Sequence, residues 1–153
     1  MPARQLFHTA RILILHAEKD AYNEYPHYIR VVNHIGNNAV RELDDAQDYI
    51  ESWTLETLEP AKYQAKTIFA GGVIMDAVKV DARISPDSCE ELGEYTYGVI
   101  ENGLEQGLFD YIQTFEPTNE TATAAGEIKG FILNFITKEW PSVIRSCLYG
   151  GTD

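Results

Sequence analysis

Residues 38–60 read NAVRELDDAQDYIESWTLETLEP. A step of about 100° per residue gathers the apolar side chains on one arc, the stripe of a surface helix. These residues are Leu43, Ala46, Ile50, Trp53 and Thr57. We predict a helix that has Asn38 as its N-cap, because an Asn side chain can accept an orphan amide hydrogen bond. Leu55 and Leu58 leave the arc, so the helix should end near Trp53 to Glu56.

The same stretch carries seven acidic residues and one base, Arg41. The acids are Glu42, Asp44, Asp45, Asp48, Glu51, Glu56 and Glu59. Asp44 and Asp48 are four residues apart, and such a like-charge pair costs about 0.2–0.5 kcal/mol in an isolated helix. No lysine lies between Arg41 and Lys62 to relieve the repulsion. The acids form either a solvated face or a negative surface that binds a basic partner.

Length and charge narrow the class of protein. The chain has 153 residues, which suits a single domain over residues 1–153. The net charge of −12 argues against direct nucleic-acid binding and against adsorption to anionic membranes, since both need lysine and arginine. It favours a basic protein as partner.

The cysteines and the N-terminus indicate a location. Cys89 and Cys147 lie far apart and outside any CxxC motif, so we expect reduced thiols rather than a disulfide scaffold or a zinc site. The apolar run Ile12–Leu15 is too short for a signal peptide, and no run reaches the length of a membrane span. We therefore expect a cytoplasmic protein with no membrane partner.

The remaining chain predicts a mainly α fold of five to seven helices around one core. Residues 3–22 form a helix whose apolar face is Leu6, Phe7, Ala10, Leu13, Ile14, Ala17 and Ala21, and Ile12 and Leu15 add a second buried side. Further helices start at Pro60 and at Ser85-Pro86-Asp87. Another follows from Ile128, Phe131, Ile132, Phe135 and Ile136. The alternative is an α+β fold with short strands at 11–15 and 28–32.

Glycine and proline place the expected boundaries. Gly36-Asn37-Asn38 predicts a turn, Gly98 a break, and Trp140-Pro141 the end of a helix before a short one at 142–149. Gly103 and Gly107 form a GxxxG pattern, which in an acidic segment indicates close helix packing.

The chemistry-bearing residues form no recognisable site. Nucleophile motifs such as GxSxG, SxxK and HExxH are absent. His16 with Asp20, and Glu24 with His27, have metal-ligand spacing, but a metal site needs further ligands that the sequence does not supply. We therefore predict no metal and no cofactor, and an enzyme is unsupported.

Acids and aromatics alternate in the segment EELGEYTY, residues 90–97. Tyrosines are enriched in the cores of interfaces, and flanking acids would speed encounter with a basic partner. We therefore add Glu91, Glu94 and Tyr95 to the predicted partner surface, beside Asp44, Asp45, Asp48, Glu51, Glu56 and Glu59.

Three functions follow from these patterns. The first is an acidic binding protein: an inhibitor or nucleic-acid mimic acting against a nuclease or defence complex, or an immunity-type protein. The second is a subunit of a homo-oligomer, held together by its helix stripes and glycine contacts. The third is a small helical enzyme or ligand-binding domain with its site in the core.

Overall fold

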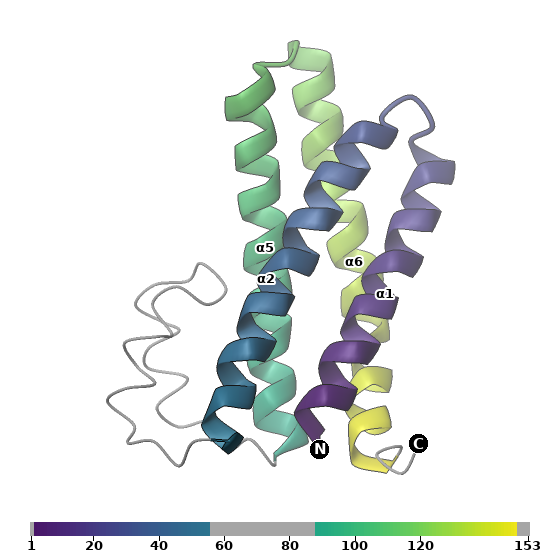
Figure 1. Cartoon of the computed structure of the whole chain (residues 1–153). Helices are drawn as coiled ribbons and strands as arrows, with labels where there is room; N and C mark the ends of the chain where they lie inside the picture. Colours follow the sequence, from purple (N-terminus) through teal and green to yellow (C-terminus); the bar gives the residue numbers. More distant parts are fainter. Residues whose placement is uncertain (1, 56–87, 150–153) are drawn as a thin grey trace.

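The structure, a computed structural model, describes residues 2–55 and 88–149. Within these ranges it contains four α-helices and no strand, which confirms the mainly α prediction. The helices are α1 (Pro2–Glu24), α2 (Ile29–Leu55), α5 (Cys89–Phe115) and α6 (Asn119–Tyr149) (Figure 1). The α+β alternative is not supported, because residues 11–15 lie inside α1 and residues 29–32 begin α2.

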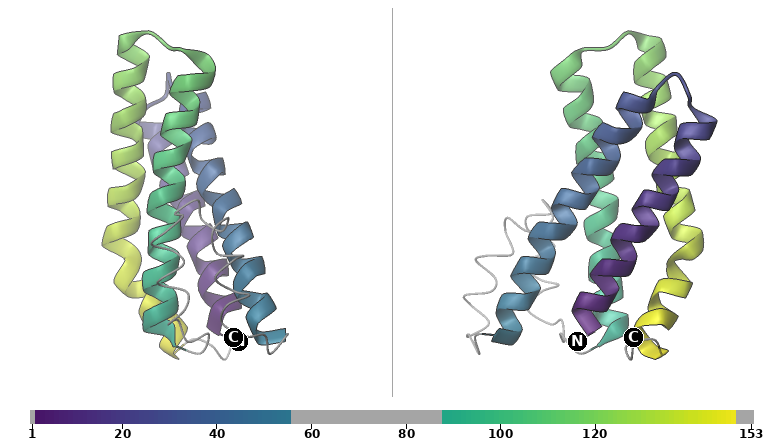
Figure 2. Two further views of the ribbon diagram at one scale, coloured as in Figure 1. Left: turned by 90° about the vertical axis from the view of Figure 1, so that its left-hand side faces the viewer. Right: turned by 45° about the vertical axis from the view of Figure 1, so that its right-hand side comes forward.

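The helices form an antiparallel bundle. α1 and α5 each pack against both α2 and α6, so the order around the bundle is α1, α2, α5, α6. Residues 25–28 connect α1 to α2, and residues 116–118 connect α5 to α6. The start of α1, the start of α5 and the end of α6 all lie at one end of the bundle (Figure 2).

The core is built from the predicted apolar faces. All seven residues of the predicted face of α1 are buried, as are Leu43, Ala46 and Ile50 of α2. In α6, Ile128, Ile132 and Ile136 are buried while Phe131 and Phe135 are partly buried against them. The predicted second buried side of α1 is wrong, because Ile12 and Leu15 are exposed. The side chains of Trp53 and Thr57 lie outside the described set.

The described helices are fewer and longer than predicted, because three expected breaks do not occur. α2 continues through residues 36–38, α5 through Gly98, and α6 through Pro141. A glycine inside a helix costs only about 1 kcal/mol relative to alanine, which tertiary packing can offset. Pro141 removes one helical hydrogen bond and typically kinks a helix. The last turns of α6 do bend away from the rest (Figure 2).

The GxxxG pattern packs α5 closely against α2, as predicted. A Cβ at Gly103 would lie 2.9 Å from Ala39 Cα, and one at Gly107 would lie 3.1 Å from the Ile35 backbone. Asn38 is not an N-cap, in contrast to the prediction, because it lies inside α2. Its Nδ2 donates a hydrogen bond to the Gly103 carbonyl at 2.7 Å. α2 is described as far as Leu55, and the predicted end of the acidic helix cannot be followed beyond it because residues 56–87 lie outside the described ranges.

The start of α5 differs from the prediction. Its N-cap is Ser88, whose Oγ accepts a hydrogen bond from the Glu91 amide at 3.2 Å. The helix start predicted at residues 85–87, and the one predicted at Pro60, lie outside the described residues.

Candidate functional site: a groove between α5 and α6

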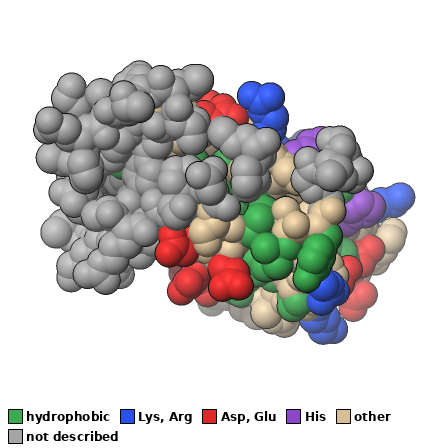
Figure 3. All heavy atoms as spheres, turned by 90° about the horizontal axis from the view of Figure 1, so that it is seen from below, with side chains coloured by type: hydrophobic (Ala, Val, Ile, Leu, Met, Phe, Trp, Pro, Cys, Tyr) green, Lys and Arg blue, Asp and Glu red, His purple; other side chains and the backbone are tan. Residues whose placement is uncertain are grey.

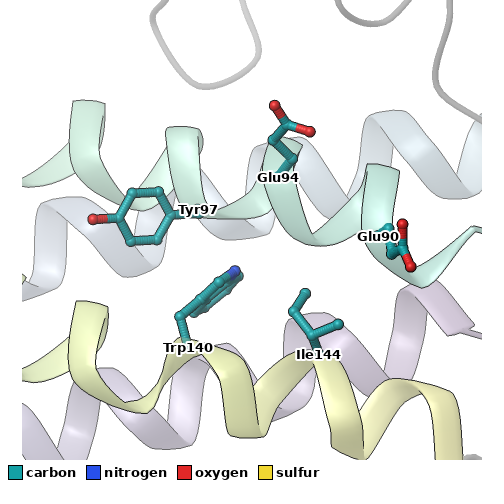
Figure 4. Close-up of a pocket in the computed structure, with 5 residues that line it drawn as sticks. All are labelled: Glu90, Glu94, Tyr97, Trp140 and Ile144. Carbon is teal, nitrogen blue, oxygen red and sulfur yellow. The ribbon is translucent and has the colours of Figure 1, made fainter.

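A shallow groove of about 300 Å³ lies between the start of α5 and the end of α6 (Figure 4). α5 contributes Glu90, Glu94 and Tyr97, which face the same way because they are spaced four and three residues apart. α6 contributes Trp140 and Ile144, also four residues apart. The groove therefore combines two carboxylates, two aromatic rings and one aliphatic side chain.

The two aromatic rings hold each other in place. The centroids of the Tyr97 and Trp140 rings are 5.6 Å apart, with the ring planes inclined by 60°. The Tyr97 hydroxyl makes a 2.6 Å hydrogen bond with Thr137 Oγ1, and Thr137 Oγ1 also donates to the Leu133 carbonyl at 2.8 Å. These bonds anchor Tyr97 to α6 and leave the nitrogen edge of Trp140 pointing toward α5 (Figure 4).

A glycine lets the two helices interlock beside the groove. Gly93 is buried, and the Ile144 side chain occupies the space that a Cβ there would need. The Trp140 Nε1 atom would lie 3.8 Å from the same Cβ. A larger residue at position 93 would have to displace Ile144, so the floor of the groove depends on this glycine.

A disulfide joins the two helices at the same end of the bundle. Cys89 and Cys147 are bonded, with their Cα atoms 5.8 Å apart. This contradicts the predicted reduced thiols: the two cysteines are 58 residues apart in sequence, but the antiparallel α5–α6 pair brings them together. Cys89 precedes Glu90 directly and Cys147 lies three residues after Ile144, so the bond holds the groove walls at a fixed separation.

The acids of α2 that belong to the predicted partner surface lie on the surface, but arginines of α1 compensate part of their charge. Arg11 Nε lies 2.7 Å from Asp44 Oδ1, and Arg4 Nε lies 3.7 Å from Glu51 Oε2. The sequence around these acids contains few bases, but the fold brings arginines of α1 next to them. Asp45 and Asp48 are exposed, whereas Glu56 and Glu59 lie outside the described residues.

The predicted partner surface on α5 is partly wrong. Glu91 and Glu94 are exposed as predicted, but Tyr95 is 6 % exposed and belongs to the core. The aromatic residues that border the exposed acids are instead Tyr97 and Trp140. Helical spacing from Glu90 and Glu94 points to Tyr97 rather than Tyr95, but the contribution of Trp140 needed the pairing of α5 with α6.

Sequence reasoning also missed a buried carboxyl group in the α1–α2 pair. Glu18 is 4 % exposed, and burial raises the pKa of Glu18 to about 7. Its side chain fills the space beside Gly36, where no Cβ would fit. On the same face of α1, the Tyr22 hydroxyl donates a hydrogen bond to Asn33 Oδ1 of α2. Burial and the Glu18 charge both raise the pKa of Tyr22.

The distribution of charge divides the bundle into two halves. α5 carries six acids and no lysine or arginine, and α2 carries five acids and two arginines. α1 and α6 each carry three acids and three bases. Because α2 and α5 are neighbours, as are α1 and α6, the excess negative charge lies on one side.

The lining of the groove has side chains that can attract a cation. Carboxylates next to aromatic faces attract cations by charge and by the quadrupole of the ring. Among residues 2–55 and 88–149, no group of three or more His, Cys, Asp or Glu side chains is placed to hold a metal ion.

None of the four described helices has a stretch both long and apolar enough to cross a bilayer. Comparison with protein-family models, curated proteins and solved structures finds no match to this chain.

Proposed function

We propose that this protein acts by binding a basic partner protein through the acidic α2–α5 half of its bundle. The observation that carries the proposal is the charge division: the two most acidic helices are adjacent, while the other two are balanced. A one-sided field of this kind steers a basic partner toward one face and suppresses binding of acidic ones.

Helix packing alone does not account for the acids of α5. Acids in the first turn favour the positive end of the helix dipole, which explains Glu90 and Glu91. The dipole effect falls off beyond that turn, so it does not explain Glu94, Glu101 or the absence of any base in the helix. A solvated face or a binding surface explains these acids, and the proposal is that they form a binding surface.

The narrower form of the proposal is an inhibitor that mimics nucleic acid, or an immunity-type protein. Glu94, Glu101 and Glu105 follow each other along α5 at about 10 Å and 6 Å, from a rise of 1.5 Å per residue. Phosphates of one DNA strand follow at about 3.4 Å. Lys129 also compensates Glu105, with Nζ 2.6 Å from Oε2. The row is sparser than a phosphate row, which favours a basic protein surface in general over mimicry.

The redox state of the two cysteines is evidence on the cellular compartment in which the protein works. The cytoplasm predicted from sequence is a reducing compartment, and the Cys89–Cys147 bond would persist mainly in an oxidising one. A count of free thiols in protein isolated without reductant distinguishes the two. Two free thiols would support the cytoplasm, and none would support an oxidising compartment.

A homo-oligomer remains the second candidate because one end of α5 exposes large apolar side chains. Phe109 and Phe115 are each 58 % exposed, and Ile112 is 37 % exposed. Such a patch is a frequent site of self-association. Sedimentation of the pure protein as a monomer would remove this candidate.

The proposal is tested by charge variants of matched size. The acidic-half variant is Asp45→Asn, Asp48→Asn and Glu101→Gln, all exposed and outside the groove. The control removes three exposed acids from the balanced helices: Asp20→Asn, Glu127→Gln and Glu139→Gln. Partners are captured from the native host at low and high salt, roughly 0.05 M and 0.5 M, where screening differs strongly.

We expect the wild type and the control to capture the same basic protein at low salt. The acidic-half variant should capture at least several-fold less, and high salt should release the partner from all three. A partner held equally by both variants, or retained at high salt, would refute the electrostatic proposal.

A further inference from the structure

We propose that the groove between α5 and α6 receives an arginine side chain of the partner. This inference rests on the proposed function, because it names the group by which a basic partner engages α5, at the edge of the acidic half where α5 meets α6. The groove provides the three features that a guanidinium on an alkyl stem requires: an aromatic face, carboxylates at the rim, and an apolar floor.

The aromatic face comes from Tyr97 and Trp140. A cation is attracted to an aromatic ring within about 6 Å of its centroid, and tryptophan attracts it most strongly. The two centroids are 5.6 Å apart and both residues line the groove, so the two rings are close enough together to act on one cation. The Tyr97–Thr137 hydrogen bond holds the Tyr97 ring against α6 before any ligand arrives, and the Gly93–Ile144 contact holds the floor of the groove. Binding then requires little ordering of the protein.

The carboxylates at the rim lack a cation of their own. Glu90 and Glu94 lie about 6 Å apart along the helix and repel each other as an i,i+4 pair. Among the described residues, neither forms an ion pair, whereas Glu105 further along α5 pairs with Lys129. The Glu94 carboxylate points away from Trp140 (Figure 4). An incoming cation would therefore relieve a repulsion that the described part of the chain leaves in place.

The apolar floor continues beyond the groove. Ile144 lies at its base, and Leu148, one helical turn later on α6, is 50 % exposed. Viewed from this end of the bundle, acidic side chains gather beside a hydrophobic area (Figure 3). Such a surface suits the methylene stem of a long basic side chain, which packs on apolar groups while its charged head reaches the carboxylates.

Arginine fits this arrangement better than lysine. Its guanidinium is planar and stacks on aromatic rings, and its fork of donors can bond two carboxylates at once. It is also less strongly hydrated than an ammonium group, so entry into a partly apolar groove costs less. A volume of about 300 Å³ accommodates one such side chain and is at the small end for an organic ligand.

The test measures binding of short peptides to the purified, oxidised protein by NMR. The probes are acetyl-Gly-Arg-Gly-amide, its lysine analogue, and its citrulline analogue, which keeps the shape of arginine without the charge. The reporter is the Trp140 indole N–H signal, and Trp53→Phe identifies it, since Trp53 and Trp140 are the two tryptophans. We expect the arginine peptide to bind about ten-fold more tightly than the citrulline peptide.

Two variants with equal charge changes separate the groove from the general field. Glu90→Gln with Glu94→Gln should lower affinity for the arginine peptide about ten-fold, while Asp48→Asn with Glu101→Gln should change it less than two-fold. Trp140→Leu, which keeps apolar bulk without a ring, should also lower it. Thermal melts of each variant verify that the bundle stays folded.

Equal shifts of the Trp140 signal with arginine and citrulline, or equal losses in both double variants, would overturn the inference. Tighter binding of lysine than arginine would overturn the choice of side chain. If the peptide test fails, the proposed function still stands provided that the variant at Asp45, Asp48 and Glu101 captures less of the basic partner. If instead the groove selects the arginine peptide but the acidic-half variant captures the partner as well as the wild type does, the wider proposal is refuted.

Discussion

The two hairpins of the bundle are closed by different chemistry. α1 and α2 meet through Glu18, whose carboxyl group is buried against Gly36 and has a raised pKa. α5 and α6 meet through the Cys89–Cys147 disulfide. The first hairpin also carries two ion pairs between its helices, Arg11–Asp44 and the longer Arg4–Glu51, and the second hairpin carries Glu105–Lys129. The stability of the first hairpin should therefore depend on pH, and that of the second on redox state.

Removal of the disulfide has the largest expected effect. In the chain-entropy model, a bond between residues 58 positions apart stabilises the folded state by about 4 kcal/mol, since it restricts the unfolded chain. Cys89→Ser with Cys147→Ser should lower the free energy of unfolding by up to that amount, measured by urea denaturation. Wild type in reductant should match the variant. A double serine variant as stable as the oxidised wild type would show that the bond does not close the hairpin.

Removal of the Glu18 charge is expected to have the next largest effect, with the opposite sign. The pKa of Glu18 is about 7 in the folded protein against an ordinary 4.5, so the folded state binds the proton more tightly than the unfolded state. The contribution of Glu18 to stability should therefore be greatest below about pH 4.5 and be lost as pH rises to about 7, by roughly 3 kcal/mol at 1.36 kcal/mol per pKa unit.

Glu18→Gln keeps the shape of the side chain without the charge. At pH 7.5 it should raise the free energy of unfolding by up to about 3 kcal/mol, and it should flatten the profile between pH 4.5 and 7. Denaturation across that range, with exposed Glu101→Gln as the control, checks both expectations. A variant less stable than the wild type at pH 7.5 would show that the ionised carboxylate is stabilised after all.

The Arg11–Asp44 and Glu105–Lys129 ion pairs should have the smallest effects, and these effects should be similar in the two hairpins. Asp44 and Glu105 are each more than half exposed, and exposed pairs contribute about 0.2–1 kcal/mol. Asp44→Asn and Glu105→Gln should each cost no more than that, and the cost should shrink at high salt. A loss above about 2 kcal/mol in either variant would show that its hairpin depends on the pair.

Periodicity alone located the buried faces, because a helix at 3.6 residues per turn has only one way to bury a regular stripe. Leu43, Ala46 and Ile50 follow from spacing, as do Ile128, Ile132 and Ile136. Helix boundaries were harder to predict where local preference opposed tertiary packing. Residues 36–38 resemble a turn by composition, yet Gly36 receives Glu18 and Asn38 bonds Gly103, so the helix continues.

The candidate site was predictable only in its acidic part. The exposure of Glu91 and Glu94 follows from the helical pattern of α5. Tyr95 and Tyr97 are both close to Glu94 in sequence, and which one enters the core depends on what packs against each side of α5. Arg4 and Arg11 could not be assigned to Glu51 and Asp44 without the placement of α1 beside α2.

The sequence by itself determined the helical class, the apolar faces and the net negative charge, because these depend on residue type and local spacing. Only the tertiary structure decided where that charge lies, that the two cysteines meet, and that Trp140 lines a groove with Glu90 and Glu94. Those features join residues tens of positions apart, and chain proximity carries no information about such pairs. In residues 38–60 the sequence placed acids on one face, and the bundle added the compensating arginines and the acidic neighbour α5.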